Sequence, residues 1–495
     1  MHTIKTLIYQ TQQIRELERL AMERFNLTGW MMMQRAGKAA CDYLQRRWPQ
    51  AKNVTVFCGN GNNGGDGYML AANAKERGLN VNILQVGQIE THKEEARQAL
   101  SACKNANIPI FPFNEKENLH HPDVIVDAIC GIGIHDLLRD ETLAAIRKMQ
   151  RIKSPILSLD IPTGIDADTG EVLGMAVHAS ATITFIGLKL GLLTGSGIAY
   201  TGDLLCHDLQ LPMDIYAHVE PVAEKITLSA YAAFLKPRTR DWHKGLSGHV
   251  VVVGGEMGYS GAARMAAEAA LRVGAGLVSV ATREEHAALL NQDCPEIMCH
   301  GIETTEQLDQ LLQKATVIIL GTGLGQTEWS KKMYEQVMKY PQPKIIDADG
   351  LNLLAMQNTH QENWILTPHP GEAARLLQTS SQQIQKDRLH AIREINKRYG
   401  GVCVLKGAGS LVLSAHTLPG LCDKGNPGMA TAGMGDVLSG VIGGLVAQNI
   451  PLSDAAKLGV CLHALAGDLA AKEGERGMLA MDLMPYLRKL SNQTS

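Results

Sequence analysis

A glycine-rich segment that ends in an aspartate is the strongest chemical signal in the chain. It reads Ala-Gly-Met-Gly-Asp over Ala432–Asp436, and the apolar run Val437–Val446 follows it. This pattern predicts a glycine turn that opens a helix. Glycines let backbone N–H groups close on an anion, the helix N-terminus adds positive partial charge, and a carboxylate there can deprotonate a substrate hydroxyl. Asp436 is therefore a candidate base. The alternative is that an aspartate in the first turn only stabilises the helix through its charge.

A second glycine-rich segment, Cys58–Gly67, follows a strand-like run far upstream. Its amide side chains and flexible backbone N–H groups, between Asn60 and Asp66, suit a phosphate-bearing ligand. Asp66 is expected to cap a helix that begins near Tyr68. Two such loops in one chain predict two sites.

Acidic residues follow two later strand-like runs of the first half. Asp127 stands in the segment Val126–Gly133, and Asp160 stands in Leu159–Gly164. In open α/β sheets ligands bind beyond the carboxyl ends of strands, so we expect these residues to share one crevice with the first glycine-rich loop. They can serve as a cation ligand and an acid–base group, although each can also cap a turn. Lys189 is a further candidate at a strand end, although a lysine at such a place is more commonly solvated.

Three segments of the second half also follow strand-like runs: Gly321–Gly325, Thr367–Glu372 and Lys406–Ser410. The lysine and glycines of the third suit an acidic diphosphate, although a hairpin turn over 407–409 is the alternative. His369 is held between two prolines, but a lone histidine is more often structural than functional.

The elements that must position these residues alternate between helical and strand-like patterns. Helical patterns at 14–25 and 31–47 open the chain. Strand-like runs then fall at 54–58, 81–86, 124–129, 156–160 and 182–186, and again at 249–253, 276–282, 317–320, 344–347, 364–367 and 402–406. This alternation predicts βαβ units and buried parallel sheets. Residues 210–248 break the rhythm, so we place a boundary near 215–230 and expect two α/β domains, 1–220 and 221–495.

Composition favours small-molecule chemistry. Lys and Arg number 47 against 50 Asp and Glu, which gives no electrostatic reason to expect nucleic acid or a membrane as a partner. The ten cysteines form no C-x-x-C pair, and Cys58, Cys130 and Cys403 are expected to be buried thiols in a reducing cytosol. Uncharged runs such as 437–453 fall short of the ~20 residues that a membrane span needs. We therefore expect a cytoplasmic protein.

The first-half motifs closely resemble the N-terminal, epimerase domain of NAD(P)H-hydrate repair proteins, over about residues 1–215. The resemblance implies that Asp160 contacts the reacting part of the substrate and is catalytic. It also implies a potassium ion held by Asn63, Asp127 and Thr163, where Thr163 replaces a serine but keeps the hydroxyl. The residues implied to bind the hydrated nucleotide are Asn62, Asn63, Gly64, Gly65, Asp66, Gly131, Ile132, Gly133, Ile134, His135, Asp136, Leu137 and Asp160.

The second-half motifs resemble the ribokinase-like superfamily, and specifically the ADP-dependent NAD(P)H-hydrate dehydratases, over about residues 225–490. The resemblance implies ADP or ATP as cosubstrate, a magnesium ion and Asp436 as the base. Hydrate contacts are implied for Ala263, Gly325, His369 and Asp436, and nucleotide contacts for Lys406, Gly407, Ala408, Gly409, Ser410 and Gly435. The expected fold is thus a Rossmann-like three-layer α/β domain followed by a ribokinase-like α/β domain.

Together the two resemblances predict nicotinamide nucleotide repair, in which one domain interconverts the R and S hydrates and the other dehydrates the S form. The expected partners are hydrated NADH or NADPH, ADP and further copies of the chain. Three alternatives remain at this point. They are a ribokinase-like kinase of a vitamin alcohol, a non-catalytic scaffold and a hydride-transferring dehydrogenase, and the last lacks a G-x-G-x-x-G after the first strand of either half.

Overall fold

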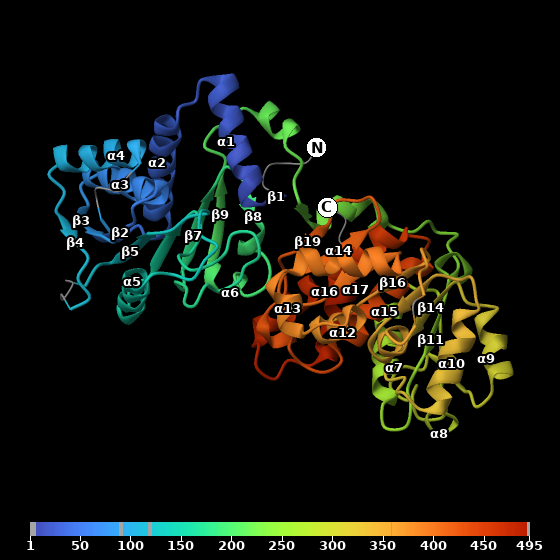
Figure 1. Ribbon diagram of the computed structural model, residues 1–495. Helices are drawn as coiled ribbons and strands as arrows, with labels where there is room; N and C mark the ends of the chain where they lie inside the picture. The colour runs from blue at the N-terminus through green and yellow to red at the C-terminus, as the bar shows by residue number, and fades with distance from the viewer. Residues whose placement is uncertain (1–5, 89–92, 117–120, 358, 493–495) are drawn as a thin grey trace. The chain divides into compact units, whose positions relative to one another are not determined.

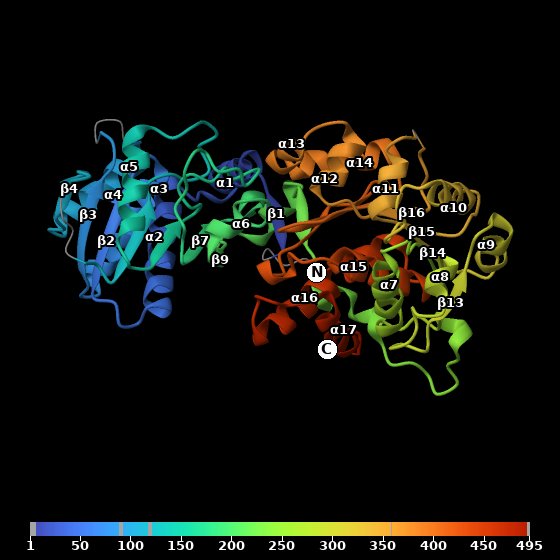
Figure 2. The same ribbon diagram turned by 90° about the horizontal axis from the view of Figure 1, so that it is seen from below.

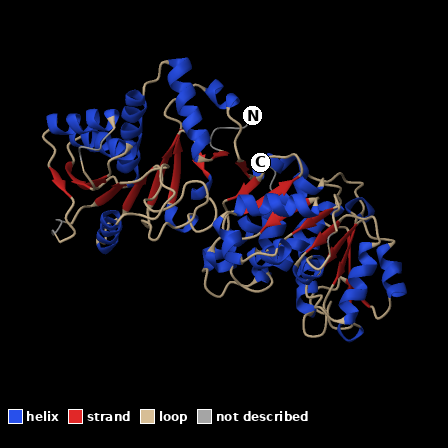
Figure 3. Ribbon diagram, viewed as in Figure 1, coloured by secondary structure: helices blue, strands red, loops and turns tan. Residues whose placement is uncertain are grey.

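The computed structural model describes residues 6–88, 93–116, 121–357 and 359–492. The chain divides into two compact units, Met1–Glu224 and Lys225–Ser495. Each unit has its own β-sheet with helices packed against it (Figures 1 and 3).

The sheet of the first unit is parallel throughout. Its strands lie in the order β4 (Ile110–Pro112), β3 (Asn80–Gln85), β2 (Asn53–Cys58), β5 (Val124–Ala128), β6 (Ile156–Leu159), β7 (Ala181–Phe185) and β9 (Asp203–His207). Strands β5, β6 and β7 are buried along their whole length, as expected where helices cover both faces. A short strand, β1 (Leu7–Tyr9), pairs in parallel with β8 (Leu188–Lys189).

Helices cover this sheet on two sides and complete three layers. Figure 1 shows α2 (Gly29–Arg47), α3 (Asn62–Glu76) and α4 (Glu94–Asn105) on one side and α5 (Asp140–Arg151) on the other. Helix α1 (Thr11–Phe25) buries Ile14, Leu17, Leu20 and Ala21 at helical spacing, which is why its amphipathic pattern is visible in the sequence.

The sheet of the second unit begins parallel and ends antiparallel. Its order is β13 (Met298–Gly301), β12 (Leu277–Thr282), β11 (His249–Val253), β14 (Val317–Leu320), β15 (Lys344–Ile346), β16 (Trp364–Leu366), β17 (Val402–Leu405), β18 (Ser410–Ser414) and β19 (Gly420–Cys422). The pairs from β13 to β17 are parallel, and those of β17 with β18 and β18 with β19 are antiparallel.

Helices also lie on both sides of this second sheet. Figure 2 shows α12 (Pro370–Leu377), α13 (Ser381–Lys386) and α14 (Arg388–Tyr399) opposite α15 (Met434–Ala447) and α16 (Leu452–Ala470). The remaining helices are α7 (Ser260–Arg272), α8 (Glu284–Ala287), α9 (Thr305–Leu312), α10 (Glu328–Met338), α11 (Ala348–Leu354) and α17 (Met484–Leu490).

Glycines allow α15 to pack unusually close to α7. A Cβ atom at Gly440 would lie 2.1 Å from the carbonyl oxygen of Ala266, and one at Gly444 would lie 2.6 Å from that of Ala270. Such distances are shorter than any real contact, so only glycine permits this helix separation. The packing fixes the first turn of α15, where Asp436 lies.

The structure confirms the strands expected from the sequence to within a residue or two, and it corrects three other expectations. Helix α3 begins at Asn62 after Gly61, so Asp66 lies inside the helix and does not cap it. Among the described residues the first element is a strand and not a helix, because β1 precedes α1. Lys189 is not solvated; it is 1% exposed.

All ten cysteines are free thiols; Cys58 and Cys403 are buried, and Cys130 is partly exposed. None of the helices in the described part of the chain has the length and apolar character needed to cross a bilayer.

Candidate active sites

A cavity of about 840 Å³ lies at the carboxyl ends of the central strands of the first unit. The predicted substrate residues that line it are Asn62, Asn63, Asp66, Gly131, Ile132, Gly133, Ile134, His135, Asp136, Leu137 and Asp160. Gly64 and Gly65 have a packing role instead, because a Cβ at either position would collide with Gly59 or Met33. The three strand-end segments predicted to share a crevice therefore meet at one cavity.

Asp127 lies below this cavity with no solvent exposure. Its carboxylate accepts hydrogen bonds from Thr163 N at 2.9 Å, Thr163 Oγ1 at 2.6 Å and Ser158 Oγ at 2.8 Å. Burial raises the pKa of Asp127, and the Thr163 and Ser158 donors oppose that rise. The Thr163 hydroxyl also accepts a bond from Cys130 N at 3.1 Å.

Asn63 supplies a buried amide without a partner. Both polar atoms of its side chain are buried and make no hydrogen bond among the described residues. Its Cβ lies 3.3 Å from the Cβ position of Gly131, next to Cys130. An unpaired buried amide costs on the order of 1–3 kcal/mol. A cation bound by its oxygen would remove part of that cost, and carboxylate, hydroxyl and amide oxygens suit a hard cation.

Asp160 forms a buried ion pair. Lys189 Nζ donates to Asp160 Oδ1 at 2.6 Å, to Thr184 Oγ1 at 2.9 Å and to the Phe185 carbonyl at 2.6 Å. Asp160 has a left-handed backbone with φ of 63°, a conformation that non-glycine residues hold only when their surroundings enforce it. The lysine thus fixes one carboxylate oxygen and leaves the other toward the cavity side of Gly131, 3.3 Å from its Cβ position.

Two further carboxyl groups line the same cavity. Glu18 of α1, which the sequence reasoning missed, lies on one helical stripe with Ile14 and Met22. Burial first, and then the charge of Asp160, raise the pKa of Glu18. The same two causes, with Glu18 as a third, hold the pKa of Asp66 well above its usual range. The cavity therefore combines the ion-paired Asp160 with two carboxyl groups whose pKa values lie above their ordinary range.

The second unit gathers four charged side chains near the start of α15. Lys406 Nζ lies 2.7 Å from Asp347 Oδ1 and 3.7 Å from Glu372 Oε2. It also lies 3.2 Å from the Cβ position of Gly435, which precedes Asp436. The structure thus brings Lys406, Gly435 and Asp436 together, and it adds Asp347 and Glu372, which the sequence reasoning did not assign.

The charged groups of this cluster shift one another's pKa values. Burial, and then the charge of Asp347, raise the pKa of Asp436 to about 7. Burial also raises the pKa of Glu372 to about 7, against the lowering effect of Lys406. Burial opposes the charge on Lys406, but Asp347 and Glu372 outweigh it and raise the pKa of the lysine. Asp436 therefore titrates near neutral pH, where a general base works best.

Gly407, Ala408 and Gly409 form the loop of the β17–β18 hairpin, with Leu405 paired to Leu411. Ser410 Oγ donates to the Gly407 carbonyl at 2.9 Å. The hairpin alternative is thus the observed local structure. A hairpin loop still offers backbone groups to a nucleotide, so its geometry is compatible with the binding role.

His369 caps α12. Its Nδ1 accepts from Gly371 N at 2.9 Å and from Glu372 N at 3.3 Å, and burial lowers its pKa. In return, Glu372 Oε2 accepts from His369 N at 2.7 Å. The capping contacts of His369 therefore help to hold Glu372 beside Lys406.

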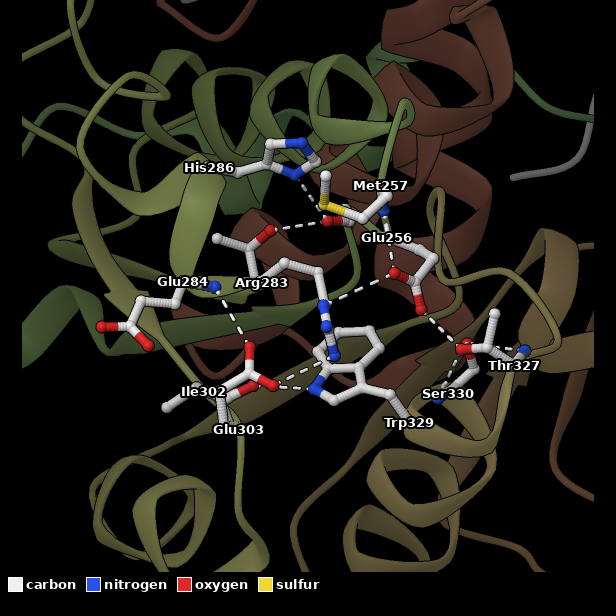
Figure 4. Close-up of polar contacts among 12 residues, drawn as sticks. Glu256, Met257, Arg283, Glu284, His286, Ile302, Glu303, Thr327, Trp329 and Ser330 are labelled. Atoms are coloured by element: carbon white, nitrogen blue, oxygen red, sulfur yellow. Dashed lines mark hydrogen bonds and ion pairs between the residues drawn. The ribbon is translucent and has the colours of Figure 1, made fainter.

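The loops after β11 and β14 are joined by Glu256 (Figure 4). Its Oε2 accepts from Thr327 Oγ1 at 2.5 Å, and its Oε1 lies 3.5 Å from Arg283 Nε. Gly325 packs against Glu256, with its Cβ position 3.1 Å from Glu256 Cγ, and has φ of 70°. Ala263 is fully buried on α7 and shows no surface to a ligand in this conformation.

Comparison with known proteins identifies both units. Residues 29–191 match the family described as YjeF-related protein N-terminus, and residues 250–489 match the family described as NAD(P)H-hydrate dehydratase. A ribokinase-like superfamily protein from Enterococcus faecalis aligns over 54% of this chain and 94% of its own, at 31% identity and a TM-score of 0.51. The fold and the site thus define a two-unit α/β enzyme with a ribokinase-like second unit.

Relatives match the whole chain. A bifunctional NAD(P)H-hydrate repair enzyme from Coxiella burnetii is 48% identical over 98% of this chain and 100% of its own length. A bifunctional NAD(P)H-hydrate repair enzyme from Escherichia coli is 43% identical over 99% of this chain and 95% of its own length. The chain belongs to the family of bifunctional NAD(P)H-hydrate repair enzymes. This membership decides against the vitamin-alcohol kinase, the scaffold and the dehydrogenase.

A solved structure extends the comparison for the second unit. The ADP/ATP-dependent NAD(P)H-hydrate dehydratase from Bacillus subtilis, co-crystallized with ATP and Mg²⁺, is 28% identical over 54% of this chain and 97% of its own, with a TM-score of 0.50.

Proposed function

We propose that the second unit dehydrates the S form of hydrated NADH or NADPH with ADP, giving AMP and phosphate. The observation that carries this proposal is Asp436 at the N-terminus of α15, beside Gly435 and the Lys406 ammonium. The N–H groups of the helix N-terminus and the Lys406 ammonium are the donors available to a phosphoryl group at this position. The carboxylate beside it can take the proton of the hydroxyl that attacks.

The proposed dehydration has two steps, phosphorylation of the C6 hydroxyl and elimination of phosphate. In the first, Asp436 accepts the proton of the C6 hydroxyl, the oxygen bonds to the β-phosphorus of ADP, and AMP leaves. In the second, the C6–O bond breaks with help from the ring nitrogen's lone pair, phosphate departs, and loss of a C5 proton restores the dihydronicotinamide. Lys406, placed by its ion pairs, offsets the charge of the transferred group.

A magnesium ion would neutralise phosphate charge when bound. Magnesium usually keeps several waters and binds through substrate phosphates with only one or two carboxylates. The described residues contain no group of three or more His, Cys, Asp or Glu side chains placed to hold a metal. A magnesium ion carried mainly by the nucleotide fits this arrangement.

We propose that the first unit interconverts the R and S hydrates. Asp160, fixed by Lys189, is the base, and the carboxyl of Asp66 or Glu18, whose pKa burial raises, is the proton donor. Support comes from their shared cavity and from the opposed environments of these carboxyls. Asn63, Asp127 and Thr163 would hold a potassium ion that screens the substrate's phosphates, because the unpaired Asn63 amide fits an oxygen ligand.

The experiment follows dihydronicotinamide absorbance and AMP release from a mixture of both hydrate epimers, with and without ADP. Asp436→Asn keeps the size of the side chain but removes the base. We expect ADP-dependent turnover to fall by ~10²–10⁴-fold. Binding of ADP, measured by calorimetry, should change little. Parental turnover by the variant would remove Asp436 from the mechanism.

We also propose that the protein acts in the cytosol as a homo-oligomer. The free thiols suit a reducing compartment. Phe234, Trp242 and Leu246 are each about two-fifths exposed within one short segment, and we propose this segment as the place to look for contact between copies. Light scattering by the full-length chain tests the oligomer, and a monomer at working concentrations would refute it.

A further inference from the structure

Asp347 lies directly after β15 and is 1% exposed. Both of its carboxylate oxygens are in use. Oδ1 accepts from Lys406 Nζ at 2.7 Å, and Oδ2 accepts from Ser439 Oγ at 2.7 Å. One side chain thus connects the end of β17 with the first two turns of α15.

These contacts decide where the Lys406 ammonium lies. The lysine follows β17, and its backbone N–H donates to the Pro368 carbonyl at 2.9 Å. Asp347 then draws the ammonium toward α15, to 3.2 Å from the Cβ position of Gly435. Without that carboxylate, Lys406 keeps an ion pair with Glu372 at 3.7 Å and the more distant charge of Asp436. That weaker contact leaves the ammonium a wider range of positions.

We propose that Asp347 is a positioning residue for phosphoryl transfer, which fixes the Lys406 ammonium against the first turn of α15 and places a carboxylate beside Asp436. The proposal rests on the proposed dehydration at Asp436. It gives Asp347 no contact with the substrate.

The effect of the Asp347 charge on the pKa of Asp436 has a direction that can be measured. Asp347 and Glu372 disfavour the ionised form of Asp436, and Lys406 favours it; these three groups are the charges that face Asp436. Removal of the Asp347 charge therefore lowers the pKa of Asp436 from its value of about 7. Because a base acts when deprotonated, the rising limb of the activity profile should move to lower pH.

The test measures kcat and kcat/KM for the S hydrate between pH 5 and 9 in the full-length chain, at saturating ADP. In Asp347→Asn we expect the acidic limb of kcat/KM to move down by about one pH unit, as removal of a near like charge does. We also expect kcat on the plateau to fall on the order of tenfold to a hundredfold, because Lys406 is no longer held in place.

Two control variants distinguish an effect of the Asp347 charge on the site from a general loss of structure. Ser439→Ala removes the second hydrogen bond of Asp347 but keeps its charge, so its limb should stay at the parental pH. Asp347→Glu keeps the negative charge on a longer side chain. The acidic limb of its kcat/KM profile should therefore lie at the parental pH, while its kcat stays low. Circular dichroism and calorimetric ADP binding show that each variant is folded.

If Asp347→Asn does not fold, Asp347→Ser provides a smaller neutral side chain for the same measurement. A limb at the parental pH in a folded neutral variant would overturn the proposal. An equal shift in Ser439→Ala would also overturn it, because the shift would then come from local disorder. If Asp436→Asn retains turnover, the proposed function fails instead, and the two failures are distinguishable.

Discussion

The environment of Asp127 makes Thr163→Val a quantitative test of the first unit. Valine has the shape of threonine and keeps the backbone N–H that donates to Asp127 at 2.9 Å. It loses the 2.6 Å bond from Oγ1 to the buried carboxylate and the acceptor of Cys130 N. A hydrogen bond to a charged group contributes about 2 kcal/mol, and a partly buried orphan N–H costs about 1 kcal/mol. The expected loss of unfolding free energy is therefore about 3 kcal/mol.

Thr163→Ser is the matched control. Serine keeps the hydroxyl and both hydrogen bonds but removes a buried methyl group, which should cost about 1 kcal/mol. The two variants should thus differ by about 2 kcal/mol in the stability of this unit. Amide hydrogen exchange of β5 and β6 in the full-length chain reports that stability separately from the second unit.

The difference between the two variants should depend on pH and on potassium. The Thr163 hydroxyl stabilises the ionised form of Asp127. As pH falls through the raised pKa of this carboxyl, Asp127 becomes protonated and the difference should shrink. Potassium, compared with sodium, should increase protection in the serine variant more than in the valine variant. Equal protection of both variants at neutral pH would refute the role given to the hydroxyl.

Two other substitutions test the remaining charged groups. Asp160→Asn should leave dehydration of the S epimer intact and make recovery from mixed epimers biphasic, because only spontaneous epimerisation remains for the R form; parental progress curves would move the base to another residue. Lys406→Ala should weaken ADP more than the hydrate, by about 1.5–3 kcal/mol, because a charge-assisted contact to one ligand is lost. Unchanged ADP affinity in calorimetry would place the diphosphate elsewhere.

Much of the fold could be predicted because buried parallel strands leave continuous apolar runs. Strand β11 at His249–Val253 and β14 at Val317–Leu320 have the predicted bounds. Edge strands were missed where the pattern is weak, as in β4, which is largely exposed, and β13, which is only half-buried. In such strands burial does not impose an apolar sequence.

The candidate sites were predictable where a motif follows one strand, and not where two distant segments meet. Lys189 was expected in solvent because nothing near it in the sequence shows its partner, which is Asp160, 29 residues earlier. Asp347 pairs with Lys406 across 59 residues, and only the strand order β15, β16, β17 brings them close. Glu18 lies on α1 between Ile14 and Met22, and nothing near it in the sequence indicates a cavity.

The glycine contacts between α15 and α7 make the position of Asp436, the base proposed above, depend on residues outside the charged cluster. Gly440 lies one helical turn beyond Asp436, and its Cβ position is 2.1 Å from the Ala266 backbone. Any side chain at this position would force α15 away from α7. Asp436, in the first turn of α15, would then be displaced with the helix. Substitutions along this seam should therefore inactivate the enzyme with every reacting group still present.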